Sequence, residues 1–158
     1  MNTTSVFVLA FALGVIAGLR ALTPLMAVSW AARLKWLAVS TTWASFLGAA
    51  ATPYIFTVLA LGELINDKLP KTPSRKAPPS FAFRIISGAF SGAALATGTN
   101  QSLALGALCG GLGAVAGTLG GYEARTRLVN ALHAPDLLIA LIEDAVAVGG
   151  GFLIASQL

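Results

Sequence analysis

The chain has 158 residues, of which 56% are hydrophobic and 10% are charged, and its mean hydropathy is +0.81. A soluble domain carries roughly 25% charged residues, so this composition excludes a soluble enzyme, a disordered tail and a nucleic-acid-binding protein. The net charge of +4 does not indicate a nucleic-acid partner, because the basic residues lie between apolar stretches, as they do in membrane proteins. We therefore predict an all-α transmembrane helix bundle in a lipid bilayer.

The first apolar stretch covers residues 5–19 and meets Arg20. Without a basic segment before it or a clear cleavage site after it, this stretch is expected to be retained rather than cleaved as a signal peptide. Thr23 and Pro24 then provide a helix cap and a proline at the first helical position, which predicts a second helix through Arg33. Residues 5–35 are thus either one long kinked helix or a span followed by an interfacial piece.

The next apolar stretch covers residues 43–65 and is interrupted by Thr52 and Pro53. It is either one kinked span, or a short re-entrant piece over 41–50 followed by a helix from Pro53. Residues 67–80 form the only long polar segment, which is rich in proline and basic residues. Because loops of this kind stay in the cytoplasm, we expect residues 67–84 to be cytoplasmic.

Three further spans are expected over residues 81–97, 102–122 and 137–158. The total is five spans if both interrupted stretches are single helices, and six if one of them is a hairpin. With residues 67–84 inside, the C-terminus lies outside, whereas Arg33 and Lys35 leave the N-terminal orientation open.

Two halves of the chain are similar to one another. The sequence from Gly14 to Gly18 reappears as Gly113 to Gly117, and in each half a later proline begins a helix that carries an acidic residue. We therefore interpret the chain as one domain, 1–158, made of a repeat unit at 4–69, a loop and connecting helix at 70–98, and a second unit at 102–158. An odd connecting helix would invert the second unit, as in many small transporters.

Glycines spaced four residues apart allow helix backbones to approach closely in lipid. We expect them to pack helices within the protomer or across a homodimer. The candidates are Gly14, Gly18, Gly88, Gly92, Gly113, Gly117 and Gly121.

Four acidic residues are candidates for an intramembrane site. Glu143 and Asp144 lie inside an apolar stretch, and Glu63 and Asp67 are one helical turn apart near the end of another. A charge at such a position costs roughly 2.5–3.5 kcal/mol unless it is paired or hydrated, so these residues are functional candidates by default. Arg20 is the available counter-ion, and we expect it to pair with Glu63 or Glu143.

Two functions remain open for this set of residues. One is a small channel or transporter in which Arg20, Glu63, Asp67, Glu143 and Asp144 line the path of an ion or small solute. The other is a structural or accessory protein in which they form a buried ionic clasp. Enzyme chemistry on lipid is a weaker third hypothesis. No catalytic residue, metal site or cofactor is expected, since no such motif survives inspection.

Three segments resemble domain-of-unknown-function family 4126, a family of short bacterial membrane proteins with no activity that we can carry over. They are GLRALTPLMAVSWAARL (18–34), GELINDKLP (62–70) and APDLLIALIEDAVA (134–147). The matching residues are Gly18, Leu19, Arg20, Pro24, Glu63, Asp67, Lys68, Pro70, Pro135, Glu143 and Asp144. The resemblance implies a multi-pass protein of the bacterial inner membrane. The sequence Lys-Thr-Pro-Ser-Arg after Pro70 departs from the commonest form of the family.

Overall fold

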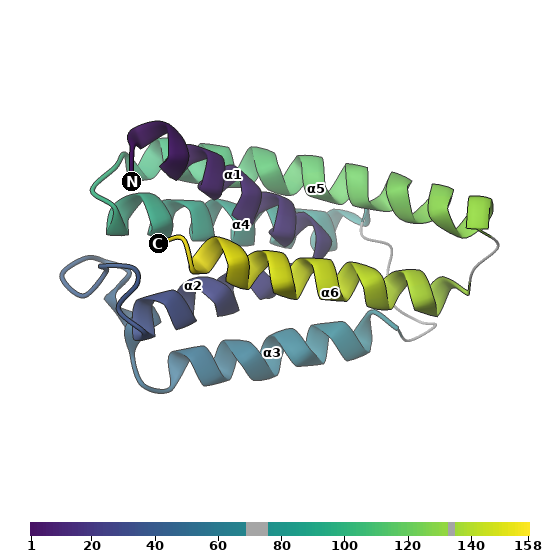
Figure 1. Ribbon diagram of the computed structural model, residues 1–158, viewed down its shortest axis with the longest axis horizontal. Coiled ribbons are helices and arrows are strands. Elements are labelled where there is room, and N and C mark those ends of the chain that lie inside the picture. The colour runs from purple at the N-terminus through teal and green to yellow at the C-terminus, as the bar shows by residue number, and fades with distance from the viewer. Residues whose placement is uncertain (69–75, 133–134) are drawn as a thin grey trace.

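The computed structural model describes residues 1–68, 76–132 and 135–158, and these residues form helices joined by shorter connections (Figure 1). The fold is all-α, as predicted. The elements are α1 (Thr3–Leu19), α2 (Thr23–Arg33), the short 3-10 helix η1 (Ser45–Gly48), α3 (Thr52–Asn66), α4 (Pro78–Gly98), α5 (Leu103–Leu132) and α6 (Asp136–Ala155).

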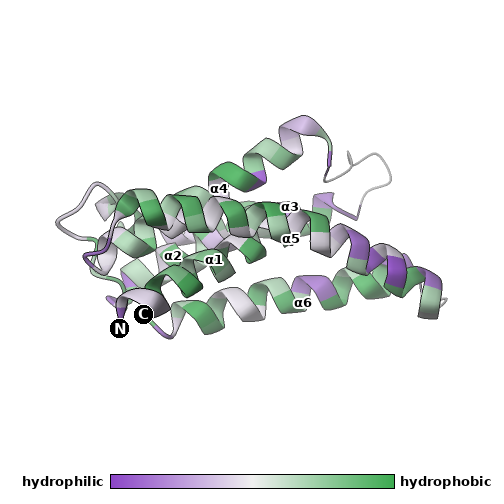
Figure 2. Cartoon of the chain, turned by 90° about the horizontal axis from the view of Figure 1, so that it is seen from above, coloured by the Kyte–Doolittle hydropathy of each residue, from purple (hydrophilic) through white to green (hydrophobic). Residues whose placement is uncertain are grey.

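Within the described residues, three helices are long and apolar enough to cross a bilayer, namely α4, α5 and α6, and α1 is a shorter apolar helix. The 21 residues of α4 extend about 31 Å, which matches a hydrocarbon core of about 30 Å. Hydrophobic residues run along most of the helix lengths, whereas hydrophilic ones gather toward the end away from the termini (Figure 2). The chain is therefore an integral membrane protein. Five or six spans stay a prediction.

The chain reverses direction between α1 and α2 (Figure 1). Pro24 occupies the first turn of α2, as predicted, but Thr23 is not the cap: Leu22 holds that position, and no side-chain hydrogen bond is made from it. However, α2 runs back toward the end that carries the termini, and it is almost entirely buried against α3, α4 and α6. Both predictions for residues 5–35 are therefore wrong. The chain turns back after α1 instead of forming one long kinked helix, and α2 packs inside the bundle instead of at the membrane interface.

Residues 34–51 lie at the same end of the bundle as the two termini. Leu37 sits beside Gly98, and the indole of Trp43 donates a hydrogen bond to Thr97 at 3.1 Å. Helix α3 begins at Thr52, close to the start at Pro53 that one of the two alternatives predicted. In place of the re-entrant piece predicted over 41–50, the structure has the short helix η1.

Helix α5 ends at Leu132, ten residues beyond the expected boundary at 122. The added turns carry Glu123 and Arg127, which form an ion pair at 2.8 Å with the spacing that stabilises a helix. The segment expected to be a connection is therefore helical.

Helices α1, α4 and α5 pack backbone against backbone. A Cβ atom added at Gly14 would lie 2.0 Å from the carbonyl oxygen of Gly110, and one added at Gly110 would lie 2.1 Å from that of Gly88. A Cβ atom added at Gly92 of α4 would lie 2.3 Å from the carbonyl oxygen of Gly106 of α5. Small residues permit such an approach, so these three helices form a close-packed scaffold.

The other expected packing glycines fall in two places. Gly18, Gly113 and Gly117 lie in the contact between α1 and α5. Gly121 instead lines an apolar cavity of about 370 Å³ between α5 and α6.

The structure does not confirm the inverted repeat. Gly14 contacts Gly110 and Ala114, and further along Gly18 contacts Gly117 and Thr118, so α1 and α5 run in the same direction. An inverted repeat requires its equivalent helices to run in opposite directions.

Gly110→Ala is expected to lower the free energy of unfolding by about 1–3 kcal/mol, because the new methyl group collides with rigid backbone. Gly120→Ala, on the same helix, has nothing within 4 Å of the new methyl group and should leave stability unchanged or slightly raised. Thermal unfolding in detergent checks both variants. Equal melting temperatures for the two would contradict the close packing.

Candidate functional site

The site is built around the break between α1 and α2. Helix ends leave backbone N–H and C=O groups without helical partners, and these groups need other partners when they are buried. The N–H groups of Ala21 and Leu22 donate to the two carboxylate oxygens of Glu63, at 2.7 and 2.8 Å. A side chain of α3 thus caps the beginning of α2, where the positive end of the helix dipole favours a carboxylate.

The carbonyl groups of the break are satisfied by α4. Arg84 is 3% exposed, and its Nη1 donates to the carbonyl oxygens of Gly18 at 2.9 Å and Leu19 at 2.8 Å. The hydroxyl of Ser87, one turn further along α4, donates to the carbonyl oxygen of Ala21. The break is therefore held in place by side chains from neighbouring helices.

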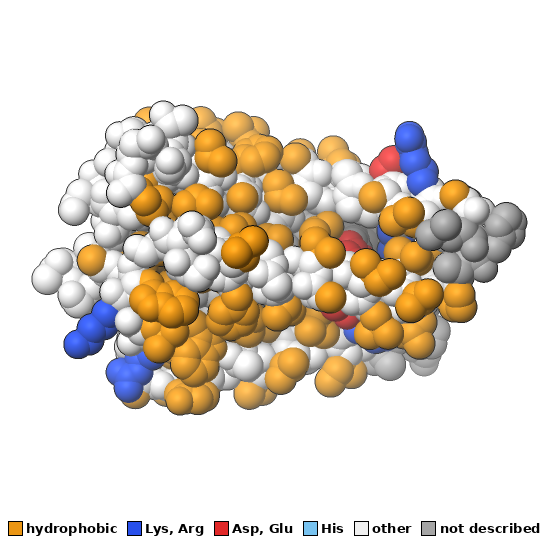
Figure 3. Space-filling view, in the orientation of Figure 1, with side chains coloured by type: hydrophobic (Ala, Val, Ile, Leu, Met, Phe, Trp, Pro, Cys, Tyr) orange, Lys and Arg blue, Asp and Glu red, His pale blue; other side chains and the backbone are white. Residues whose placement is uncertain are grey.

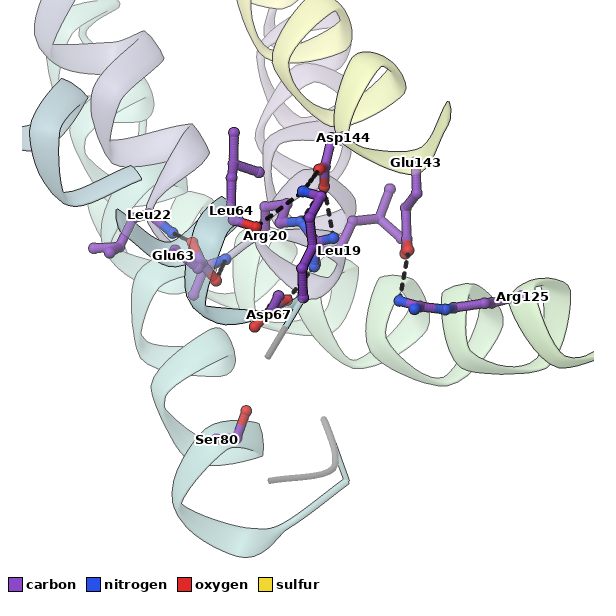
Figure 4. Close-up of polar contacts among 12 residues, drawn as sticks. Leu19, Arg20, Leu22, Glu63, Leu64, Asp67, Ser80, Arg125, Glu143 and Asp144 are labelled. Carbon is purple, nitrogen blue, oxygen red and sulfur yellow. Dashed lines mark hydrogen bonds and ion pairs between the residues drawn. The ribbon is translucent and has the colours of Figure 1, made fainter. Parts of the chain in front are cut away.

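Arg20 lies in the break itself and is completely buried. Its Nε donates to Asp144 of α6 at 2.6 Å, and its Nη1 donates to Asp67 at the end of α3 (Figure 4). The ammonium group of Lys68 donates to the other oxygen of Asp144 at 2.5 Å. Arg20 thereby joins the break to α3 and α6.

Three cations and three anions meet here, and their formal charges cancel. The guanidinium of Arg84 completes the group, with Nη2 at 4.0 Å from Glu63 and 3.9 Å from Asp67. The members of this ionic cluster are Arg20, Glu63, Asp67, Lys68, Arg84 and Asp144. Removing charges from water is costly, so close pairing is what makes their burial tolerable.

An open cavity of about 400 Å³ lies against the ionic cluster. Glu63, Asn66 and Asp67 of α3 line it on one side, and Ser80 and Arg84 of α4 on the other. The side chains of Glu63 and Asp67 are 12% and 14% exposed, so both carboxylates reach the cavity without leaving their partners. The cluster is therefore accessible from outside the bundle. On the face in Figure 3, acidic and basic side chains likewise show among apolar ones, toward the end opposite the termini.

Glu143 lies apart from the ionic cluster. Its carboxylate is 3.7 Å from Nη1 of Arg125 on α5, and Arg125 also forms a two-pronged contact with Asp136 at 2.9 and 2.5 Å. Glu143 and Asp144 are adjacent in the chain, but the helix directs them toward different neighbours (Figure 4).

The expected partners of Arg20 were wrong. It pairs with Asp67 and Asp144, whereas Glu63 caps α2 and Glu143 contacts Arg125. Asp67, just after α3, lies in the cluster. The reason is that the reversal after Leu19 turns the guanidinium of Arg20 toward the end of α3.

Sequence analysis did not select Arg84, Ser87 or Lys68 as site residues. Arg84 was assigned to the cytoplasmic loop at 67–84, although it follows Phe81 at the beginning of an apolar stretch. A basic residue inside an apolar stretch is the signal that could have identified it. Ser87 carries no such signal, because serine is common where membrane helices pack.

Among the residues that the structure describes, no three His, Cys, Asp or Glu side chains are arranged to hold a metal ion. The family model described as "Domain of unknown function (DUF4126)" matches residues 7–156. The chain belongs to this family. No curated protein and no solved structure matches the chain. The family assignment confirms the resemblance of the three segments and assigns no activity to the site.

Arg20→Ala is expected to lower the free energy of unfolding by about 3–5 kcal/mol, because it leaves Asp67 and Asp144 buried without their main counter-ion. Arg127→Ala removes an arginine whose side chain is 77% exposed and should change stability by less than about 0.5 kcal/mol. Thermal or denaturant unfolding in detergent compares the two. A small effect of Arg20→Ala would show that the buried pairing contributes little.

Proposed function

We propose that this integral membrane protein is a small transporter or gated channel for an ion or small polar solute. The observation that carries the proposal is the cavity of about 400 Å³, which meets buried charges at the reversal between α1 and α2. The solute would bind beside Glu63, Asp67 and Arg84.

Two physical arguments support transport. Irregular backbone at membrane depth is tolerated where it lines a cavity, and Ala21 and Leu22 of the reversal between α1 and α2 line this one. In addition, a buried ion-pair network is weak evidence for stability, since apolar side chains of similar volume often stabilise a protein as well or better. A solute that binds beside them would give a further reason for retaining six charges next to a cavity.

The end of the bundle at which the cavity lies supports a particular orientation of the protein in the membrane. The cavity opens at the end of the bundle that carries Lys68, Lys76 and Arg125, whereas the described basic side chains at the opposite end are Arg33 and Lys35. Cytoplasmic ends of membrane proteins are enriched in basic residues. We accordingly propose that this end faces the cytoplasm, and that the membrane is the bacterial inner membrane.

The alternative is a structural or accessory protein with an ionic clasp. The balanced charge of the ionic cluster favours it, because each member already has a partner within the chain. Enzyme chemistry on lipid is not part of the proposal. A homodimer stays a prediction.

A flux assay with purified protein in liposomes tests transport. The panel contains protons, monovalent cations, anions and small polar solutes. Glu63→Gln is expected to abolish flux, because an amide nitrogen, which cannot accept a hydrogen bond, replaces one of the two accepting oxygens and the charge that faces the cavity is lost.

Glu123→Gln is the matched control, since it alters an exposed ion pair on α5 outside the cavity and should retain flux. Flux that survives Glu63→Gln would exclude this site. No flux for any solute, together with a lower melting temperature for Glu63→Gln, would favour the clasp.

A further inference from the structure

The helices that surround the cavity are attached to the protein in two different ways. Helices α1, α4 and α5 are packed backbone to backbone, so they cannot shift against one another without collisions. Helix α3 packs along α2 and against η1, and within the described residues no comparable interface joins it to α1, α4, α5 or α6. Only Pro53 and Ala60 of its residues are buried.

The first half of α3 is anchored to α2. The indole of Trp30 donates to the hydroxyl of Thr57 at 3.0 Å, and its ring meets that of Tyr54 edge to face at 5.2 Å. These contacts combine a hydrogen bond with aromatic packing, so this half of the helix has a defined position.

The last turn of α3 is held by charged side chains. Glu63 binds the beginning of α2, Asp67 binds Arg20, and Lys68, just after the helix, binds Asp144 of α6. Polar contacts of this kind can exchange for contacts with water or a solute when a cavity reaches them. Such exchange allows movement that interlocked apolar packing would prevent.

Space for movement exists on the side of α4. Gly62 lines the cavity, and a Cβ atom added there would have nothing within 4 Å. Across the same cavity lie Ser80, Phe83 and Arg84 of α4. The last turns of α3 can therefore approach α4 and close the cavity between them.

We propose that the second half of α3 is the gate of this cavity, which is latched by Glu63, Asp67 and Lys68 and moves against the fixed scaffold of α1, α4 and α5. This inference rests on the proposed function for what the gate controls, but the movement itself can be measured without a substrate. Hinged closure around a fixed scaffold is a common way for a binding site to change its accessibility.

Spin-label distances test the movement in the full-length protein in nanodiscs. Cysteines replace Gly62 and Val8 in one sample, and Ile86 and Val8 in the other, with Cys109→Ala in both. Val8 on α1 is 60% exposed and Ile86 on α4 is 63% exposed, so all three positions have room for a label. Both pairs measure from α1 to the end of the bundle that holds the cavity.

The distribution of distances between the labels at positions 62 and 8 is expected to be broad or to have two maxima. It should shift when Glu63→Gln and Asp67→Asn remove the contacts that hold the end of α3. The distribution for Ile86 and Val8 is expected to be narrow and unchanged. Two equally narrow distributions, both insensitive to the latch variants, would overturn the gate.

Cross-linking then connects the movement to flux. A bismaleimide between cysteines at Gly62 and Phe83 should abolish flux, whereas the same reagent on a single cysteine at Val8, which lies outside the cavity, should leave flux unchanged. Undiminished flux after cross-linking would overturn the gate while leaving the transport proposal intact. If the wild-type protein shows no flux but the spin-label distances shift, the proposed function fails and the movement stands.

Discussion

The structure depends on one constraint: the backbone between α1 and α2 is broken inside an apolar protein, and its polar groups must be satisfied there. Hydrocarbon cannot supply hydrogen bonds, so neighbouring helices do. Glu63 of α3 accepts from the N–H groups, and Arg84 and Ser87 of α4 donate to the carbonyl groups. The positions of α3 and α4 relative to α1 follow from these bonds.

The same constraint explains why charges gather at this place. Glu63 enters the interior to cap α2, and Arg84 enters to bind carbonyl oxygens, so each brings a charge that needs compensation. Arg20, Asp67, Lys68 and Asp144 complete a balanced set around them. The network therefore satisfies the backbone groups between α1 and α2 and also lines the cavity with charged side chains. Glu63 does both.

Close glycine packing and a charged latch divide the bundle into a part that is fixed and a part that is not. Where backbones touch, as at Gly14, Gly88 and Gly110, any displacement meets hard repulsion. Where α3 ends, the polar contacts lie beside a cavity, where water or a solute can take the place of a partner. This contrast lets a chain of 158 residues hold a defined scaffold and still keep one element able to move.

The sequence by itself determined the class and the elements of this protein. Its hydropathy predicts membrane helices, Pro24 and Pro53 mark where two of them begin, and the three segments identified the family, because these signals are local and do not depend on contacts. Four of the five path residues, all except Glu143, do meet at one place.

Only the tertiary structure decided which charges pair. The reversal after Leu19 turns Arg20 toward Asp67 and Asp144. The sequence alone is equally compatible with a kinked helix that continues in the same direction after Leu19. The roles of Arg84 and Ser87 depend on carbonyl groups more than sixty residues away in the chain. Long-range partners of this kind follow from how the helices pack, and helix periodicity does not encode that arrangement.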